Sequence, residues 1–173
     1  MVLRGPSGAG KSTVAKALAE ELKALGQRSA YFDMDYFRQI IPGRGLKGSE
    51  SAKVCSAMLL GALRGALECG HHVILEGIFS IRSFKSFLLD LQLEYSSRIY
   101  FFYINVNFEE TLRRHQTRAK AAEFGSEDMA DWYPAASPLS SDGGFGVCVE
   151  TEIEQSSEIA SSVLTILRTA GLF

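Results

Sequence analysis

The chain has 173 residues, of which 46% are hydrophobic and 22% are charged, a composition typical of a globular protein with a substantial core. Its net charge of −2 gives no general attraction to nucleic acid or to anionic membranes, so any basic surface must be local. No apolar stretch reaches the roughly 20 residues that a membrane-spanning helix needs.

The first predicted elements are a strand and a helix on either side of a glycine-rich segment. Residues 1–4 are a short apolar run, and residues 13–25 carry apolar side chains on one helical stripe that Gly26 can end. Between them, residues 5–12 match in full the phosphate-binding pattern of a glycine, four residues and then Gly-Lys-Ser. Strand, loop and helix come in the order that this motif requires, so the sequence indicates nucleoside triphosphate binding.

The residue types of this loop explain how it holds polyphosphate. Glycines let backbone N–H groups point inward around an anion, beside the positive end of the following helix. Lys11 places a cation on the β- and γ-phosphates, and the Ser12 hydroxyl is the natural first ligand for Mg²⁺. The residues of this segment that we expect to contact the nucleotide are Gly5, Ser7, Gly8, Ala9, Gly10, Lys11, Ser12 and Thr13.

Two carboxylates lie where the second predicted strand, residues 29–33, ends. If the strand persists, Asp33 and Asp35 share one face. A carboxylate beside the γ-phosphate can accept the proton of an attacking hydroxyl, and we expect Asp35 to do so, although Asp33 is the alternative base. Asp33 and Arg38 are candidate substrate ligands. Asp35 also suits the N-cap of a helix that starts at Tyr36.

A third carboxylate follows the next strand. A long helix is predicted over residues 49–67, and the apolar run of residues 73–75 is typical of a strand buried on both faces. Glu76 then lies at the carboxyl end of a strand, where α/β sheets bind ligands. We expect it to hold a water of Mg²⁺ or to contact the substrate, and the following Gly77 favours this because it permits close backbone approach. The alternative is a strand-end acid that meets solvent.

The second half of the chain continues the alternation of strands and helices. Strands are predicted at residues 99–106 and 147–149, and helices at residues 81–91 after Ser80 as N-cap, after Asn107 with Glu110 as a capping-box-like start, and at residues 158–170. Repeated strand–helix units predict an α/β fold with a parallel sheet. Residues 124–145 are irregular, and Trp132 and Tyr133 within them are candidates for a substrate-binding or base-binding wall.

Basic residues cluster just before that irregular segment, at Arg113, Arg114, Arg118 and Lys120. Arg114 and Arg118 share one helix face. Guanidinium groups stabilise the charge of a phosphoryl group in transfer, often from a lid that closes over the phosphates. We therefore expect a lid over about residues 113–145, with Arg118 as the first candidate for catalysis. The alternative is a solvated helix face.

The cysteines and histidines indicate neither disulfides nor zinc. Cys55, Cys69 and Cys148 lack the spacing of metal ligands or redox motifs and are typical of a reducing compartment. His71 and His72 are adjacent, so on a strand they would point to opposite faces. We expect one domain over residues 1–173, in the cytoplasm and without a signal peptide, because the first strand begins at once.

These motifs resemble those of the small P-loop kinases and, within them, the group around zeta toxins and chloramphenicol phosphotransferase. The resemblance rests on residues 5–12, on Asp35 with its following aromatics and Arg38, on residues 73–77, and on residues 110–115 followed by Arg118. It implies a three-layer fold in which helices flank a five-stranded parallel sheet of order 2-3-1-4-5.

The same resemblance implies roles for particular residues. Asp35 would be the general base, and Arg114 and Arg118 would bind the triphosphate. Residues 150–156 would pack near the adenine. The acceptor pocket would lie between residues 35–47, the segment 76–82 with Arg82 as a candidate ligand, and the irregular insert.

Together, these features predict an ATP- and Mg²⁺-dependent phosphotransferase that acts on a hydroxyl of a small molecule, such as an antibiotic, a nucleoside, a sugar or a related metabolite. Two alternatives are a toxin-like kinase of a nucleotide sugar and a nucleotide-dependent switch or binding module with little transferase activity. The acidic balance disfavours a polynucleotide acceptor. The preference for ATP over GTP and the oligomeric state are open at this point.

Overall fold

The computed structural model describes residues 1–40, 49–117, 122–133, 138–139, 150–154 and 158–172. Its strands are β1 (Val2–Arg4), β2 (Ser29–Asp33), β3 (His72–Glu76), β4 (Phe101–Asn105) and β5 (Glu150–Glu154). Its helices are α1 (Lys11–Ala24), α2 (Met34–Ile40), α3 (Ser49–Glu68), α4 (Ile81–Tyr95), α5 (Phe108–Gln116), α6 (Ser126–Trp132) and α7 (Ile159–Thr169), with a short 3-10 turn η1 (Ser96–Arg98).

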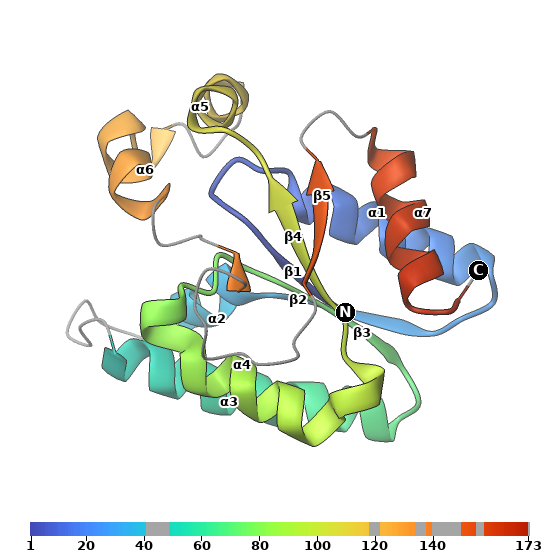
Figure 1. The fold of residues 1–173 in the computed structure, drawn as a ribbon. Helices are drawn as coiled ribbons and strands as arrows, with labels where there is room; N and C mark the ends of the chain where they lie inside the picture. Colours follow the sequence, from blue (N-terminus) through green and yellow to red (C-terminus); the bar gives the residue numbers. More distant parts are fainter. Residues whose placement is uncertain (41–48, 118–121, 134–137, 140–149, 155–157, 173) are drawn as a thin grey trace.

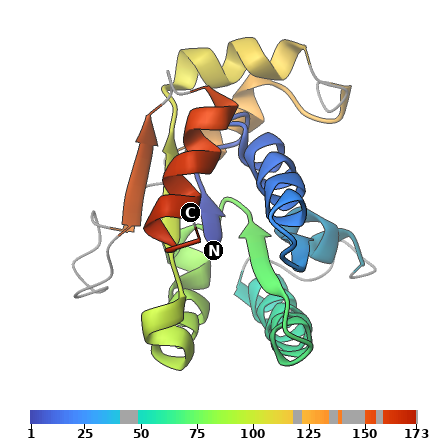
Figure 2. The same ribbon diagram turned by 90° about the vertical axis from the view of Figure 1, so that its right-hand side faces the viewer.

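The five strands form one parallel sheet in the order β2-β3-β1-β4-β5. The predicted fold class and strand order are thereby confirmed. Helices α1 and α7 lie against each other on one face, and α3 and α4 lie together on the other (Figure 1, Figure 2). Helices α5 and α6 lie beyond the carboxyl end of β4 (Figure 1), so they sit at the end of the sheet where α/β proteins bind ligands.

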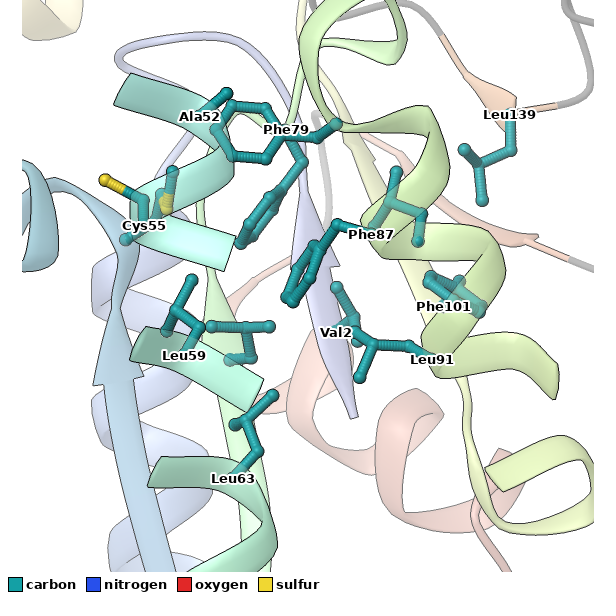
Figure 3. Close-up of a cluster of buried hydrophobic side chains, with 14 residues drawn as sticks. Val2, Ala52, Cys55, Leu59, Leu63, Phe79, Phe87, Leu91, Phe101 and Leu139 are labelled. Carbon is teal, nitrogen blue, oxygen red and sulfur yellow. The ribbon is translucent and has the colours of Figure 1, made fainter. Parts of the chain in front are cut away.

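Alternation along the strands divides the buried side chains between two cores. Neighbouring strand residues point to opposite faces, so Val2 packs with α3 and α4 whereas Leu3 packs with α1 and α7. In the first core, side chains of α3 such as Leu59 face side chains of α4 such as Phe87 across Val2 (Figure 3). Burial on both faces explains why the central strands are continuous apolar runs.

The end of the sheet differs in part from the sequence-based expectation. The strand predicted at residues 147–149 lies outside the described residues, and the structure places β5 at Glu150–Glu154. As a consequence, residues 150–154 belong to the sheet and are not a loop beside the adenine. The hydrophobic pattern of residues 150–154 is a weak strand signal. The reason is that β5 pairs with β4 alone, at the edge of the sheet, and its buried apolar side chain is Ile153.

No helix in the described ranges is long and apolar enough to cross a membrane.

Candidate active site

The glycine-rich loop between β1 and α1 has the backbone conformation that its sequence predicts. Gly8 has a φ of 83°, and a Cβ placed on it would lie 2.8 Å from the carbonyl oxygen of Thr111. Gly5 has a φ of 145°, and a Cβ there would lie 2.6 Å from the carbonyl oxygen of Ile104. Only glycine fits these two positions, so the loop is a side-chain-free cradle at the start of a 14-residue helix.

Lys11 is the first residue of α1, and its side chain folds back over the loop. Its ammonium donates to the carbonyl oxygens of Gly5 at 3.1 Å and Pro6 at 2.8 Å, and the residue is only 8% exposed. The loop therefore holds a cation beside its glycine-rich backbone. This donor set fits a polyphosphate.

A cavity of about 760 Å³ opens from this loop. It gathers most of the residues that the sequence singled out, namely Ser7, Gly8, Gly10, Lys11, Ser12, Asp33, Asp35, Arg38, Glu76 and Arg82. Gly5, Ala9 and Thr13 belong to the loop and the first turn of α1 but are not among its lining residues. The candidate phosphate ligands and the candidate acceptor ligands thus share one space.

Asp33 and Asp35 are arranged differently from the prediction. The strand ends at Asp33 and does not continue through Asp35, so the two carboxylates do not share a strand face. The Asp33 carboxylate accepts a hydrogen bond of 2.8 Å from the Asp35 backbone N–H. Asp33, and not Asp35, therefore caps α2, which begins at Met34 and not at Tyr36.

Asp35 lies in the first turn of α2 and lines the cavity. Its carboxylate is 3.9 Å from the guanidinium of Arg38, one turn further along the helix. Arg38 in turn lies over the ring of Phe84, at 5.6 Å from the ring centre. The two side chains are each about half exposed and both line the cavity. A ligand in the cavity can therefore reach the Asp35 carboxylate and the Arg38 guanidinium.

Glu76 is not a strand-end acid that meets solvent, because it is only 2% exposed. The Tyr31 hydroxyl donates to its Oε1 atom at 2.6 Å. Burial, followed by the hydrogen bond and the charge of Glu76, raises the pKa of Tyr31 well above its ordinary value. Tyr31 is a site residue that the sequence analysis missed, because its link to Glu76 depends on β2 and β3 being neighbours in the sheet.

Ser12 and Glu76 are the oxygen donors that the sequence predicted for Mg²⁺, and both line the cavity. In the described part of the chain, no group of three or more His, Cys, Asp or Glu side chains could hold a metal. Mg²⁺ at phosphate sites is held by one or two protein oxygens together with substrate phosphates and water. The hydroxyl and the buried carboxylate fit an ion of this kind.

Two neighbouring arginines on α5 have different surroundings. Arg114 donates to the carbonyl oxygen of Ala9 at 3.0 Å, and thereby ties α5 to the phosphate-binding loop. The Arg113 side chain is 71% exposed and pairs with Glu110. The solvated-face alternative therefore holds for Arg113 but not for Arg114. Arg118 and Lys120 lie outside the described residues.

Aromatic side chains form part of the cavity wall. Phe124 and Trp132 line the cavity, with ring centres 5.0 Å apart, and the buried His115 stacks on Phe124 at 4.5 Å. Tyr133 has a different role, since its hydroxyl donates to the carbonyl oxygen of Val106 at 2.8 Å and its ring packs on Phe108. Of the two aromatic candidates, the structure brings only Trp132 to the cavity.

A buried arginine, which the sequence analysis also missed, contacts the backbone next to the cavity-lining residues. Arg4 donates to Glu150 at 2.7 Å and to the carbonyl oxygen of Phe79 at 3.1 Å. Phe79 has a φ of 43°, unusual for a residue other than glycine. Arg4 thus links β1 and β5 to the segment after Glu76, of which Gly77, Ile78 and Ser80 line the cavity.

The chain belongs to an AAA domain family, whose model matches residues 1–133. A gluconokinase from Sinorhizobium meliloti superposes with a TM-score of 0.64 at 18% identity, over 98% of this chain and 92% of that one. A sugar kinase from a Janibacter species gives a TM-score of 0.68 at 17% identity, over 99% and 93%. A mutant of the APS kinase from Mycobacterium tuberculosis gives 0.63 at 17% identity, over 96% and 93%. No curated protein matches the sequence.

These similarities show that the chain shares its fold with the three kinases over nearly its whole length. The expected fold is confirmed. The narrower resemblance to zeta toxins and chloramphenicol phosphotransferase stays a prediction.

Proposed function

We propose that this protein is an ATP- and Mg²⁺-dependent kinase that phosphorylates a hydroxyl group of a small molecule. The observation that carries the proposal is the shared cavity, in which Lys11 and Ser12 face the same space as Asp35, Arg38 and Arg82. The cavity of about 760 Å³ has room for an acceptor beside the phosphate loop, and a site that only hydrolyses nucleotide does not need acceptor-binding side chains there.

The residues have complementary roles in this reaction. Lys11 and the loop amides bind the β- and γ-phosphates, and Ser12 with Glu76 holds Mg²⁺, which neutralises phosphate charge when bound. The acceptor oxygen forms a bond to the γ-phosphorus while the bond to the ADP oxygen breaks. The proton of the acceptor hydroxyl passes to the Asp35 carboxylate. Asp33, Arg38 and Arg82 bind and orient the acceptor.

Two arginines complete the proposed site. Arg114 on α5 is held at the loop by Ala9 and carries its positive charge next to the phosphates. Arg118, four positions later in the sequence, is proposed to stabilise the phosphoryl group in transfer. We place both in a lid of about residues 113–145 within a single kinase domain.

The acceptor is proposed to be a small polar molecule. A sugar or related polyol is supported by two structural neighbours, a gluconokinase and a sugar kinase. The resemblance to zeta toxins and chloramphenicol phosphotransferase adds nucleotide sugars and antibiotics to the candidates. The charged side chains that line the cavity suit an acceptor with several hydroxyl groups.

Mass spectrometry of reaction mixtures tests the proposal. The protein is incubated with ATP, Mg²⁺ and panels of sugars, nucleosides, nucleotide sugars and antibiotics, and each candidate is examined for the gain of one phosphoryl group. Lys11→Ala should abolish transfer, whereas the exposed Lys16→Ala, on the same helix, should not. ATP binding without transfer to any panel member would favour the switch alternative over a kinase.

A further inference from the structure

We propose that Tyr31 is a positioning residue for the Mg²⁺ site, where its hydroxyl holds the Glu76 carboxylate in the orientation that receives the metal. The inference rests on the proposed function, because it concerns the Mg²⁺ that this function requires. Tyr31 has no part in the phosphate-binding motif, and its role follows from contacts that only the folded sheet creates.

The contact between Tyr31 and Glu76 joins two adjacent strands. Tyr31 on β2 is in register with Ile74 on β3, and Asp33 is in register with Glu76. Residues two apart on a strand share a face, so the Tyr31 ring lies on the same side of β2 as Asp33. From there its hydroxyl reaches Glu76 Oε1 at 2.6 Å.

The carboxylate that Tyr31 contacts faces the same space as the phosphate loop. Glu76 and Ser12, the two side chains proposed to hold Mg²⁺, both line the cavity. Tyr31, Glu76 and Ser12 come from three different elements, β2, β3 and α1.

Glu76 needs such a partner because it is buried at 2% exposure. A buried carboxylate needs a hydrogen-bond partner to offset the loss of its hydration. The bond to Oε1 also fixes the rotation of the carboxylate group, so that Oε2 points in a constant direction. Partners that orient a metal ligand in this way typically contribute about 10- to 100-fold to metal affinity.

Tyr31→Phe removes the hydroxyl and keeps the ring. The chain offers a matched control in Tyr95→Phe, since the Tyr95 hydroxyl also donates to a glutamate, Glu94, at 2.8 Å, but on α4 and away from the cavity that holds the phosphate loop. The probe is an ATP analogue with an imido group in place of the β,γ-bridging oxygen, titrated by calorimetry with Mg²⁺ and again with EDTA.

We expect Tyr31→Phe to reduce the gain in analogue affinity due to Mg²⁺ by about tenfold or more and to leave the affinity in EDTA unchanged. Tyr95→Phe should change neither value. In a Glu76→Gln background, Tyr31→Phe should have little further effect on the Mg²⁺ gain, because the two residues act through one contact. Thermal unfolding of each variant establishes that it is folded.

The proposal is overturned if Tyr31→Phe keeps the full Mg²⁺ gain, or if it weakens binding equally with Mg²⁺ and with EDTA. It is also overturned if the wild-type protein shows no Mg²⁺ gain, or if the effects of Tyr31→Phe and Glu76→Gln simply add. None of these measurements includes an acceptor. A wild-type protein that binds the analogue with Mg²⁺ but phosphorylates nothing would therefore contradict the proposed function and leave the role of Tyr31 intact.

Discussion

The guanidinium of Arg114 donates to the carbonyl oxygen of Ala9 at 3.0 Å, across 105 positions of sequence. Arg114 also donates to Glu110 at 2.7 Å on its own helix. The arginine is therefore held from two sides at the phosphate-binding loop. It is preorganised for phosphate charge, because little side-chain freedom is left to lose when nucleotide binds.

Replacement of this arginine should weaken nucleotide binding. Arg114→Ala removes a charge-assisted contact worth about 1.5–3 kcal/mol, which corresponds to roughly a 10- to 100-fold loss of ATP affinity or of turnover. The neighbouring Arg113→Ala is the matched control, because its side chain is mostly exposed and pairs only with Glu110 among the described contacts. Calorimetric titration with ATP measures both variants, and equal losses would mean that α5 contributes only general positive charge.

Substitution of the two aspartates tests which of them is the base. Asp35→Asn should lower turnover by about 10²- to 10⁴-fold, since an amide cannot accept the proton, while ATP affinity stays close to wild type. Asp33→Asn should have a smaller effect, because asparagine caps a helix as well as aspartate does. Turnover and ATP affinity are measured for both variants. A large loss of turnover in Asp33→Asn alone would transfer the role of base to Asp33.

Two glycines should respond in opposite ways to substitution by alanine. Gly8→Ala should destabilise the protein by about 1–3 kcal/mol, because the loop needs a positive φ there and the new Cβ would meet the Thr111 carbonyl oxygen. Gly61→Ala, within α3 and with open space around its added Cβ, should stabilise it by about 0.5–1 kcal/mol. Urea unfolding gives both values, and an unchanged Gly8→Ala would mean that the loop tolerates a different conformation.

Lowering the pH should reduce the stability of the folded protein through Glu110 on α5. Hydrogen bonds from Arg113 and Arg114 lower the pKa of Glu110 from 4.5 to about 2. In the folded state this carboxyl therefore binds fewer protons than in the unfolded state between these two values, and stability rises with pH there. The contribution is complete above about pH 4.5 and is lost as the pH falls towards 2.

The comparison variant for this pH dependence is Glu110→Gln, which cannot ionise. Urea unfolding of both proteins at about pH 6 and pH 3 should show the larger loss of stability in the wild type. Parallel losses would show that Glu110 contributes nothing to the acid sensitivity of the fold.

Local patterns predicted much of this molecule. The phosphate-binding loop, the strand at residues 29–33 and the Asn107 cap, which accepts from the Glu110 N–H at 2.9 Å, depend on residues close together in the chain. Predictions were wrong where a pattern is short or where two residues fit it equally well. Asp33 and Asp35 both suit an N-cap, and only the observed end of β2 at Asp33 decides between them.

The sequence by itself determined the class of fold and the position of the phosphate-binding motif, because glycine spacing and hydrophobic periodicity are properties of short segments. Tertiary structure alone decided the contacts of Tyr31 with Glu76, Arg114 with Ala9 and Arg4 with Glu150, which span 45, 105 and 146 positions. Such pairs form only when the order of the strands and the packing of α5 bring their partners together. No local pattern carries that information, because nothing in the sequence around either partner specifies the distant residue that it contacts.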